Sequence, residues 1–156
     1  MRRKDREVTD PVKIREIMTA CTCCRLGLCS EGRAYIVPLN FGLEEKEGHY
    51  VLYFHSALEG RKMDLLRKSG WVSFEMDRGH EIMEHPNSSH CSARYECVMG
   101  GGRVTLLEDR EEKKAGLAAL MLHDTGTGQW EFEDAMVDKT AVIRLDVEEL
   151  TCKVRA

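Results

Sequence analysis

Long apolar segments are missing from this sequence of 156 residues. A helix that crosses a membrane needs about 20 consecutive apolar residues, and no stretch of the chain approaches that length. The opening, MRRKDREVTD, is basic at its start and then acidic, without the apolar region that a secretory signal requires. We therefore expect no membrane span and no export, and predict a cytoplasmic protein.

A surplus of positive charge is also absent. The chain has 23 Lys and Arg against 27 Asp and Glu, a net charge of −4 and a pI near 5.9. Proteins that bind nucleic acids neutralise phosphates with an extended basic surface, and this sequence has no basic stripe. Nucleic acid is therefore excluded as a general partner, whereas the local pair Arg61-Lys62 suits one small anion.

The patterns of disulfide and metal sites are incomplete. The seven cysteines are odd in number, and without export we expect reduced thiols. Cys21 and Cys24 form a C-x-x-C, and His85, His90 and Cys91 could supply the other half of a zinc or iron site. The second half lacks paired C-x-x-C spacing, so we predict no metal. A metal-binding interaction module remains an alternative.

What is present indicates one globular domain over residues 1–156, with 42% apolar and 32% charged residues. Capping signals and apolar patterns predict helices at 11–20, 61–68 and 109–123, and strands at 25–29, 34–41, 49–55, 71–76, 92–107 and 140–147, which 150–154 extend. Residues 44–48 are predicted as a charged turn and 77–94 as a long functional or mobile loop. Six strands without a βαβ rhythm indicate a mainly β (α+β) fold, a small antiparallel barrel.

Two strand features indicate close contacts. Pro38 removes a backbone donor, which places its strand at an edge or bulge and leaves backbone groups of residues 39–41 free for a flat ring. Three glycines, Gly100, Gly101 and Gly102, indicate a bend or the close approach of another backbone or ring. Barrel curvature alone would also explain both features.

The stretch from Tyr50 to Lys62, YVLYFHSALEGRK, combines a buried strand with an anion-binding pattern. Ser56 follows the strand, Gly60 allows a tight turn, and Arg61 and Lys62 open a short helix. The free N–H groups and dipole of a helix N-terminus, with a hydroxyl and two cations, suit a phosphate monoester. The alternative is a solvated Arg-Lys pair on an ordinary surface helix, because the flanking glycines of a P-loop are missing.

Residues 54–62, FHSALEGRK, resemble the phosphate-binding segment of the pyridoxamine 5'-phosphate oxidase-like flavoproteins, without a gap. The segments MRRKDRE, PLNFG and FHSA resemble, more narrowly, the branch of the 5-nitroimidazole resistance proteins. The resemblance implies a six-stranded antiparallel split β-barrel with short flanking helices. It also implies a homodimer that binds FMN in the two grooves between its subunits.

The same resemblance implies which residues contact the cofactor: Pro38, Leu39, Asn40, Phe41, His55, Ser56, Ala57, Arg61, Lys62 and Tyr95. Arg61, Lys62 and Ser56 are expected at the phosphate or ribityl chain and the 38–41 segment at the ring. Tyr95 stands where the oxidases have a glutamine, so its contact departs from the family pattern.

The predicted function is an FMN-dependent reductase or oxidase of small aromatic or nitro compounds, with His55 as the catalytic residue that meets the substrate. A non-catalytic flavin or haem-binding carrier or sensor is the alternative function. For His55 itself the alternative is a partly buried strand-end residue hydrogen-bonded to the backbone. Pyridoxamine phosphate oxidation is not expected, because the family's substrate-binding C-terminal segment has no clear counterpart after Val147.

Overall fold

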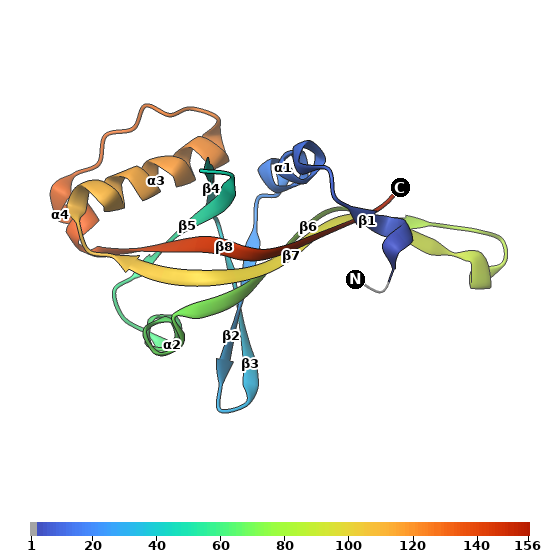
Figure 1. Cartoon of the computed structure of the whole chain (residues 1–156), viewed down its shortest axis with the longest axis horizontal. Coiled ribbons are helices and arrows are strands. Elements are labelled where there is room, and N and C mark those ends of the chain that lie inside the picture. Colours follow the sequence, from blue (N-terminus) through green and yellow to red (C-terminus); the bar gives the residue numbers. More distant parts are fainter. Residues whose placement is uncertain (1–2) are drawn as a thin grey trace.

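The computed structural model describes residues 3–156, which form one curved antiparallel sheet with helices on both of its faces (Figure 1). The strands are β1 (Glu7–Val8), β2 (Cys24–Ser30), β3 (Arg33–Leu39), β4 (Gly42–Lys46), β5 (His49–Ala57), β6 (Trp71–Met83), β7 (Ser92–Leu107) and β8 (Thr140–Arg155). The helices are α1 (Pro11–Ala20), α2 (Arg61–Ser69), α3 (Arg110–Thr125) and α4 (Asp134–Asp138), with short 3-10 turns at Lys4–Arg6 and Ser88–His90. The predicted mainly β class is confirmed, with eight strands where six were expected.

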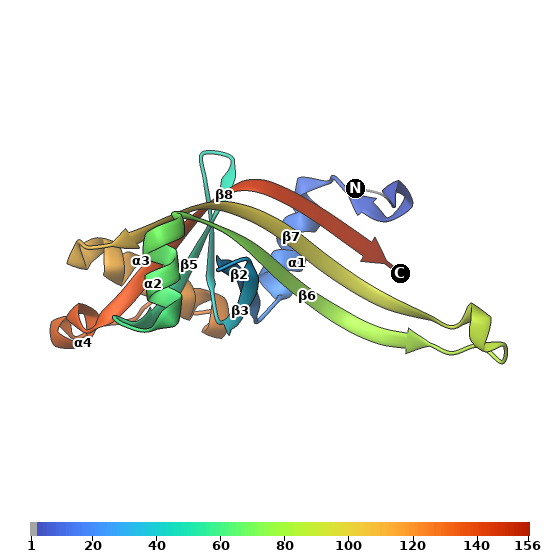
Figure 2. The same ribbon diagram turned by 90° about the horizontal axis from the view of Figure 1, so that it is seen from below.

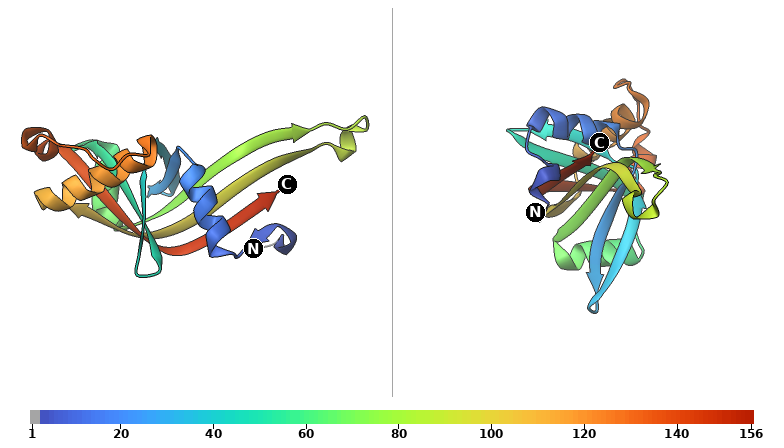
Figure 3. Two further views of the ribbon diagram at one scale, coloured as in Figure 1. Left: turned by 90° about the horizontal axis from the view of Figure 1, so that it is seen from above. Right: turned by 90° about the vertical axis from the view of Figure 1, so that its right-hand side faces the viewer.

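The sheet closes on itself at a two-residue corner. Its strand order is β3-β2-β6-β7-β8-β5-β4, and β1 pairs with the end of β8. The two edge strands, β3 and β4, are separated in the chain only by Asn40 and Phe41. Because the edges meet at this corner, the sheet must curl into a barrel, as the end-on view in Figure 3 shows. Pro38 lies on an edge strand, as predicted.

Strand β5 separates two apolar clusters. Leu52 and Phe54 belong to the main core, together with Met63 and Leu66 of α2. Val51 and Tyr53 pack instead against α3, whose Ala119 and Leu120 complete a second cluster. Alternate residues of a strand point to opposite faces, so α2 and α3 cover opposite sides of β5 (Figures 1 and 2).

Side-chain caps fix the helix starts that the sequence predicts. Asp10 accepts a hydrogen bond from the Val12 amide at 3.0 Å, and Asp109 accepts from the Glu111 and Glu112 amides, each at 3.0 Å. These bonds satisfy donors that a helix leaves free in its first turn. Helix α4, of five residues, was not predicted, because it is too short to show a helical period.

The three consecutive glycines of β7 allow close packing rather than break the strand. A Cβ on Gly100 or Gly102 would collide with backbone carbonyls of β8, and one on Gly101 would collide with the Trp71 ring. The register of β7 with β8 shifts between Gly101 and Gly102, which marks a bulge. The predicted close approach of another backbone and a ring is confirmed.

The predicted charged turn at 44–48 is wrong, because most of it is strand. Residues Gly42–Lys46 form β4 and pair with β5, and only Glu47 and Gly48 turn, both with positive φ. Edge strands commonly carry charged side chains, which prevent pairing with other chains. The charge pattern of an edge strand therefore resembles that of a loop.

The predicted loop at 77–94 is also largely wrong. Strand β6 continues to Met83 and β7 begins at Ser92, so the two form an arm that extends away from the barrel (Figure 2). Ion pairs between neighbouring strands, Arg78 with Glu96 and Arg94 with Glu81, hold the arm together. Most of the arm beyond Asp77 is exposed, so it lacks the apolar alternation from which strands are predicted.

None of the helices in the described part of the chain is long and apolar enough to cross a membrane.

Replacement of Gly42 by alanine should destabilise the protein strongly. The new Cβ would lie 2.5 Å from the Leu120 amide nitrogen and 2.6 Å from the Ala119 carbonyl carbon, so α3 would have to move away from β4. We expect a loss of about 2 kcal/mol or more in the free energy of unfolding, measured by urea titration. Gly27→Ala is the control, because its Cβ would lie 3.7 Å from Ser73. Equal stability of the two variants would contradict the packing described.

Candidate functional site

The N-terminus of α2 presents its amides without a side-chain cap. Gly60 precedes the helix with φ 120° and ψ 167°, a conformation that side-chain-bearing residues rarely adopt. No side chain among residues 3–156 caps this end, so the first amides remain available to a ligand. The predicted turn at Gly60 and helix start at Arg61 are confirmed.

Two cations stand at this helix end without acidic partners. The Arg61 guanidinium lies over the Tyr35 ring, 4.5 Å from its centroid, in a cation–π contact. Lys62 is half-buried, and burial lowers the pKa of its ammonium group below the ordinary value. Within residues 3–156, neither has a carboxylate oxygen within 4.0 Å. Unpaired cations at the positive end of a helix dipole favour an anion.

The side chains of the last residues of β5 point to opposite faces of the sheet. Ser56 continues the face of Leu52 and Phe54, which is the side covered by α2. His55 continues the face of Val51 and Tyr53, which is the side covered by α3. The structure therefore places Ser56 on the side of Arg61 and Lys62, and His55 away from them. Ala57, the end of β5, is exposed and pairs with Thr140.

The 38–41 segment forms the corner between β3 and β4. Pro38 and Asn40 are exposed and Leu39 is half-buried, whereas the Phe41 side chain is fully buried and its ring lies 4.2 Å from that of His123. The Asn40 side-chain amide donates to Asp124 of α3 at 3.1 Å. A ligand at this corner can therefore contact the Phe41 backbone but not its ring.

Tyr95 lies far from Ser56 in the same chain. It pairs with Arg155 near the far end of β7, whereas Leu107, at the end nearest Ser56, pairs with Val142. Twelve residues of extended strand span about 40 Å. The Tyr95 hydroxyl accepts a hydrogen bond from Arg6 at 3.2 Å, and its ring stacks near His80. Tyr95 and Ser56 therefore lie near opposite ends of the sheet.

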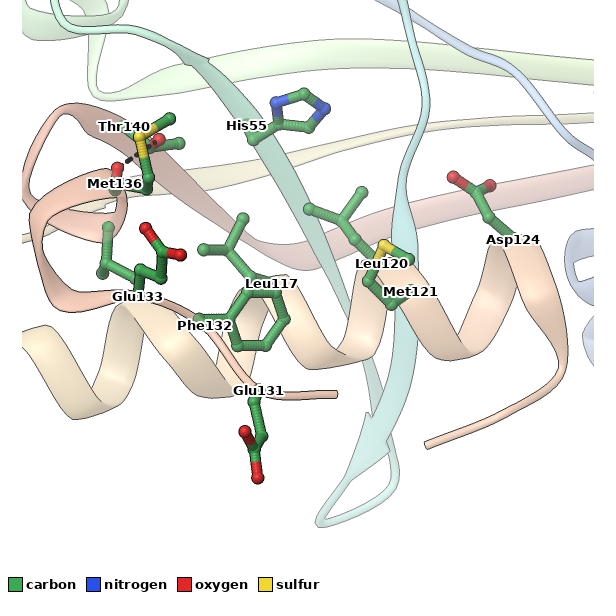
Figure 4. A pocket seen from close by; sticks show the side chains of 11 residues that line it. His55, Leu117, Leu120, Met121, Asp124, Glu131, Phe132, Glu133, Met136 and Thr140 are labelled. Atoms are coloured by element: carbon green, nitrogen blue, oxygen red, sulfur yellow. Dashed lines mark hydrogen bonds between the residues drawn. The ribbon is translucent and has the colours of Figure 1, made fainter. Parts of the chain in front are cut away.

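His55 faces a pocket of about 340 Å³ beneath α3 and α4, which we call the α3–α4 pocket (Figure 4). Its apolar lining comes from Leu117, Leu120, Met121, Phe132, Met136 and Val137, and its polar lining from His55, Asp124, Glu131, Glu133 and Thr140. The side chain of His55 is exposed and makes no hydrogen bond within residues 3–156. It therefore differs from the alternative interpretation, a partly buried strand-end histidine whose side chain bonds to the backbone.

Ion pairs fix the short helix α4 against α3. Arg110 donates to Asp138 at 2.7 and 3.0 Å and to Asp134 at 3.1 Å, and Lys114 lies 2.8 Å from Asp134. Hydrogen bonds from Lys114 and Arg110 hold the pKa of Asp134 and that of Asp138, respectively, below the ordinary carboxyl value. The wall of the pocket that α4 supplies is thus attached electrostatically.

The cysteines do not assemble a metal site. Cys21, Cys24 and Cys152 are buried, whereas Cys29 and Cys91 are exposed. Within residues 3–156, no group of three or more His, Cys, Asp or Glu is arranged to hold a metal ion. Cys21 to Cys24 and the His85 to Cys91 turn do not form one ligand set, because Cys24 lies beside the middle of β6, next to the Arg25–Glu75 pair, whereas the turn lies beyond the end of β6 at Met83.

Comparison with known proteins identifies the family. Residues 10–154 match the family model described as pyridoxamine 5'-phosphate oxidase. The chain belongs to this family. No curated protein sequence matches the chain significantly.

Solved structures agree with this assignment. A candidate 5-nitroimidazole antibiotic resistance protein from Bacteroides thetaiotaomicron shares 33% identity over 95% of this chain and 86% of its own, with a TM-score of 0.83. The flavocytochrome Anf3 from Azotobacter vinelandii shares the fold, with 20% identity over 100% of this chain and 72% of its own and a TM-score of 0.82. An FAD and heme binding protein from Mycobacterium smegmatis also shares it, with 15% identity over 96% of this chain and 73% of its own and a TM-score of 0.81. The resemblance to this family and to its nitroimidazole-resistance branch is confirmed.

Sequence reasoning missed Tyr35 and the α3–α4 pocket. Tyr35 contacts Arg61 only because β3 passes close to α2, and no local pattern around Tyr35 indicates that neighbour. The pocket depends on α4, which was not predicted, and on residues that are more than 60 positions from His55 in the chain. Phe132, one of two aromatic residues near the glycines of this loop, was the one sequence signal of the pocket.

Thiol reactivity should follow burial. Burial raises the pKa of the Cys21 thiol to about 11 and that of Cys24 further, so both remain protonated near neutral pH. We expect Cys29 and Cys91 to be alkylated first when native protein is pulsed with N-ethylmaleimide at about pH 8, with sites assigned by mass spectrometry. Alkylation of Cys21 and Cys24 at the rate of Cys91 would contradict the buried placement.

Proposed function

We propose that the protein is an FMN-binding flavoprotein whose phosphate site is the N-terminus of α2. The observation that carries the proposal is the presence of two cations without acidic partners, Arg61 and Lys62, at an uncapped helix end. Family membership supports it, as do solved relatives named as flavin-binding proteins. FMN is favoured over FAD because this site suits a terminal phosphate monoester, which FMN has and FAD lacks.

The flavin ring is proposed to lie at the β3–β4 corner. Arg61 touches Tyr35 of β3, so the phosphate site adjoins the strand that leads to Pro38 and Leu39. The exposed Pro38 and Asn40, and the backbone of Phe41, are then the contacts available to a ring. Ser56 lies on the α2 side of β5 and would donate its hydroxyl to the phosphate or ribityl chain, near the backbone of Ala57.

A second copy of the chain is proposed to complete the site. The outer face of the sheet carries a groove of about 490 Å³ with Ile36 63% exposed and Met99 40% exposed. Exposed apolar side chains on the outside of a sheet favour burial against another protein. A homodimer would cover them, and it would allow Tyr95, which lies far along β7 from Ser56 of its own chain, to approach the cofactor of the partner subunit.

The proposed activity is reduction or oxidation of small aromatic or nitro compounds. A bound flavin would supply the electron transfer, and the protein would bind and orient the flavin and the substrate and would exclude water. His55 is the candidate to contact the substrate or to deliver a proton, because it is exposed, free of protein hydrogen bonds in the described chain, and faces a pocket. The 33% identity to a nitroimidazole-resistance candidate supports nitro compounds as substrates.

The phosphate site can be tested by comparing FMN with riboflavin, which lacks the phosphate. Wild-type protein should bind FMN more tightly, and Arg61→Ala should weaken FMN binding by roughly 10–100-fold, because a charge-assisted hydrogen bond contributes about 1.5–3 kcal/mol. Riboflavin affinity should barely change. Quenching of flavin fluorescence measures both constants.

Lys68→Ala is the matched control, because it removes the same charge from the exposed last turn of the same helix. If Lys68→Ala weakened FMN binding as much as Arg61→Ala, the loss of affinity would come from net charge alone, and this result would falsify the proposed site. A purified protein with a haem Soret band and no flavin absorbance would favour the haem-carrier alternative.

The affinity for FMN should fall at alkaline pH. Burial lowers the pKa of Lys62 in the free protein, whereas a bound phosphate would favour the ammonium form and raise it. Binding therefore takes up a proton, and affinity is lost as pH rises through the lowered pKa, below the ordinary lysine value of about 10.4. Lys62→Arg keeps its charge in this range and should remove that part of the pH dependence. An identical pH profile for both proteins would exclude Lys62 from the phosphate site.

A further inference from the structure

The α3–α4 pocket has an excess of carboxylates. Asp124, Glu131 and Glu133 line it, and no Lys or Arg is among its lining residues in the described chain. His55 is the one lining side chain that can carry a positive charge. In Figure 4, Asp124 and Glu133 lie toward opposite ends of the apolar wall, with His55 across from that wall, while Glu131 points away from it.

The nearest cations are already paired with other acids. Arg110 binds Asp134 and Asp138, and Lys114 binds Asp134 and Glu111. These pairs attach α4 to α3, and they leave no free cation there to balance the carboxylates of the pocket.

The carboxylates of the pocket have no such partners. Asp124 accepts a hydrogen bond from the Asn40 amide, which is neutral. Within residues 3–156, Asp124, Glu131 and Glu133 have no Lys, Arg or His nitrogen within 4.0 Å. Their negative charge therefore acts on whatever occupies the cavity.

We propose that this pocket binds small aromatic molecules that are cationic or neutral and rejects anionic ones. A cavity of about 340 Å³ with apolar walls suits one or two fused rings. Beside an apolar wall, charges interact more strongly than in bulk water, so unpaired carboxylates disfavour an anionic ligand. This inference rests on the proposed function in one respect, that the occupant facing His55 is the substrate.

One consequence separates this chain from the reaction after which its family is named. The ring of pyridoxamine 5'-phosphate carries a phosphate, and an anion of that kind would face the carboxylates of this pocket. The cationic end of α2 could hold such a phosphate, but it lies on the opposite side of β5 from His55. The carboxylates of the pocket thus disfavour phosphorylated rings in the space in front of His55.

A redox-inert ligand series tests the charge selection without any turnover. Benzylamine, benzyl alcohol and benzoate have similar size and carry a positive, zero and negative charge. Binding to the purified full-length protein is measured by NMR shifts of the Met methyl groups, with Met121 and Met136 as the pocket reporters. We expect the affinity to fall in the order benzylamine, benzyl alcohol, benzoate, with about tenfold or more between the first and last at low salt, and less at high salt.

Variants locate the selection in the pocket. Glu133→Gln and Asp124→Asn keep the shape of each side chain and should each reduce the benzylamine-to-benzoate ratio several-fold. Glu131→Gln should do so less, because that carboxylate points away from the wall (Figure 4). Glu31→Gln removes the same charge from the turn between β2 and β3, which is remote from α3, and should leave the ratio unchanged.

Equal affinity for the three ligands, or a ratio that Glu31→Gln changes as much as Glu133→Gln, would overturn the inference. The charge selection is independent of flavin binding, so its failure can be told from failure of the proposed function. Charge selection in a protein that binds no flavin would support the inference about the pocket and contradict the proposal of a flavoprotein. A flavoprotein that reduces 4-nitrobenzoate as efficiently as 4-nitrobenzylamine, without selection in the binding series, would support the proposed function and contradict the inference about the pocket.

Discussion

The alternation of side chains along a strand is the constraint on which this site depends. At the end of β5, Ser56 continues the face that packs on α2, and His55 continues the face that packs on α3. A single strand thereby serves a cationic helix end on one side and an acidic pocket on the other. His55 and the cations of GRK, which the sequence motif brings close together, therefore lie on opposite faces of the sheet.

The two sides differ in charge in a way that suits two different molecules. Arg61 and Lys62 lack acidic partners in the described chain, whereas the carboxylates of the α3–α4 pocket lack basic ones. An anionic cofactor would be attracted to the α2 side and repelled by the α3 side, and a cationic substrate would behave in the opposite way. Such a separation would prevent the substrate from competing for the phosphate site, although both must approach the same strand.

Local chemistry in the sequence was enough to predict most of the elements. Asp10, Asp109 and Gly60 define helix starts by capping or by backbone conformation, and these positions are correct because the relevant contacts lie within a few residues. The β6–β7 arm and β4 were missed, because strands with exposed or charged faces lack apolar alternation. The pairing of Arg61 with Tyr35 was beyond reach, because it depends on how the barrel closes.

The candidate site was predicted in composition more than in arrangement. The structure puts Ser56 on the face of β5 that packs on α2, and Arg61 and Lys62 in the first turn of that helix, while their roles in binding stay a prediction. Phe41 and Tyr95 were carried over from a family pattern, and the structure gives each a different setting: the first is buried against His123, and the second contacts Arg6 near the end of β7 that is far from Ser56. A motif preserves residue order, but it does not record burial or which subunit supplies a contact.

The opposed orientation of His55 and Ser56 limits how the gene for such a protein can change. Insertion or deletion of one residue in the second half of β5 would turn the serine toward α3 and the histidine toward α2, exchanging their surroundings. Changes of two residues would preserve the orientation but shift both along the barrel. This strand can therefore accept substitutions of its side chains, but hardly any change in its length.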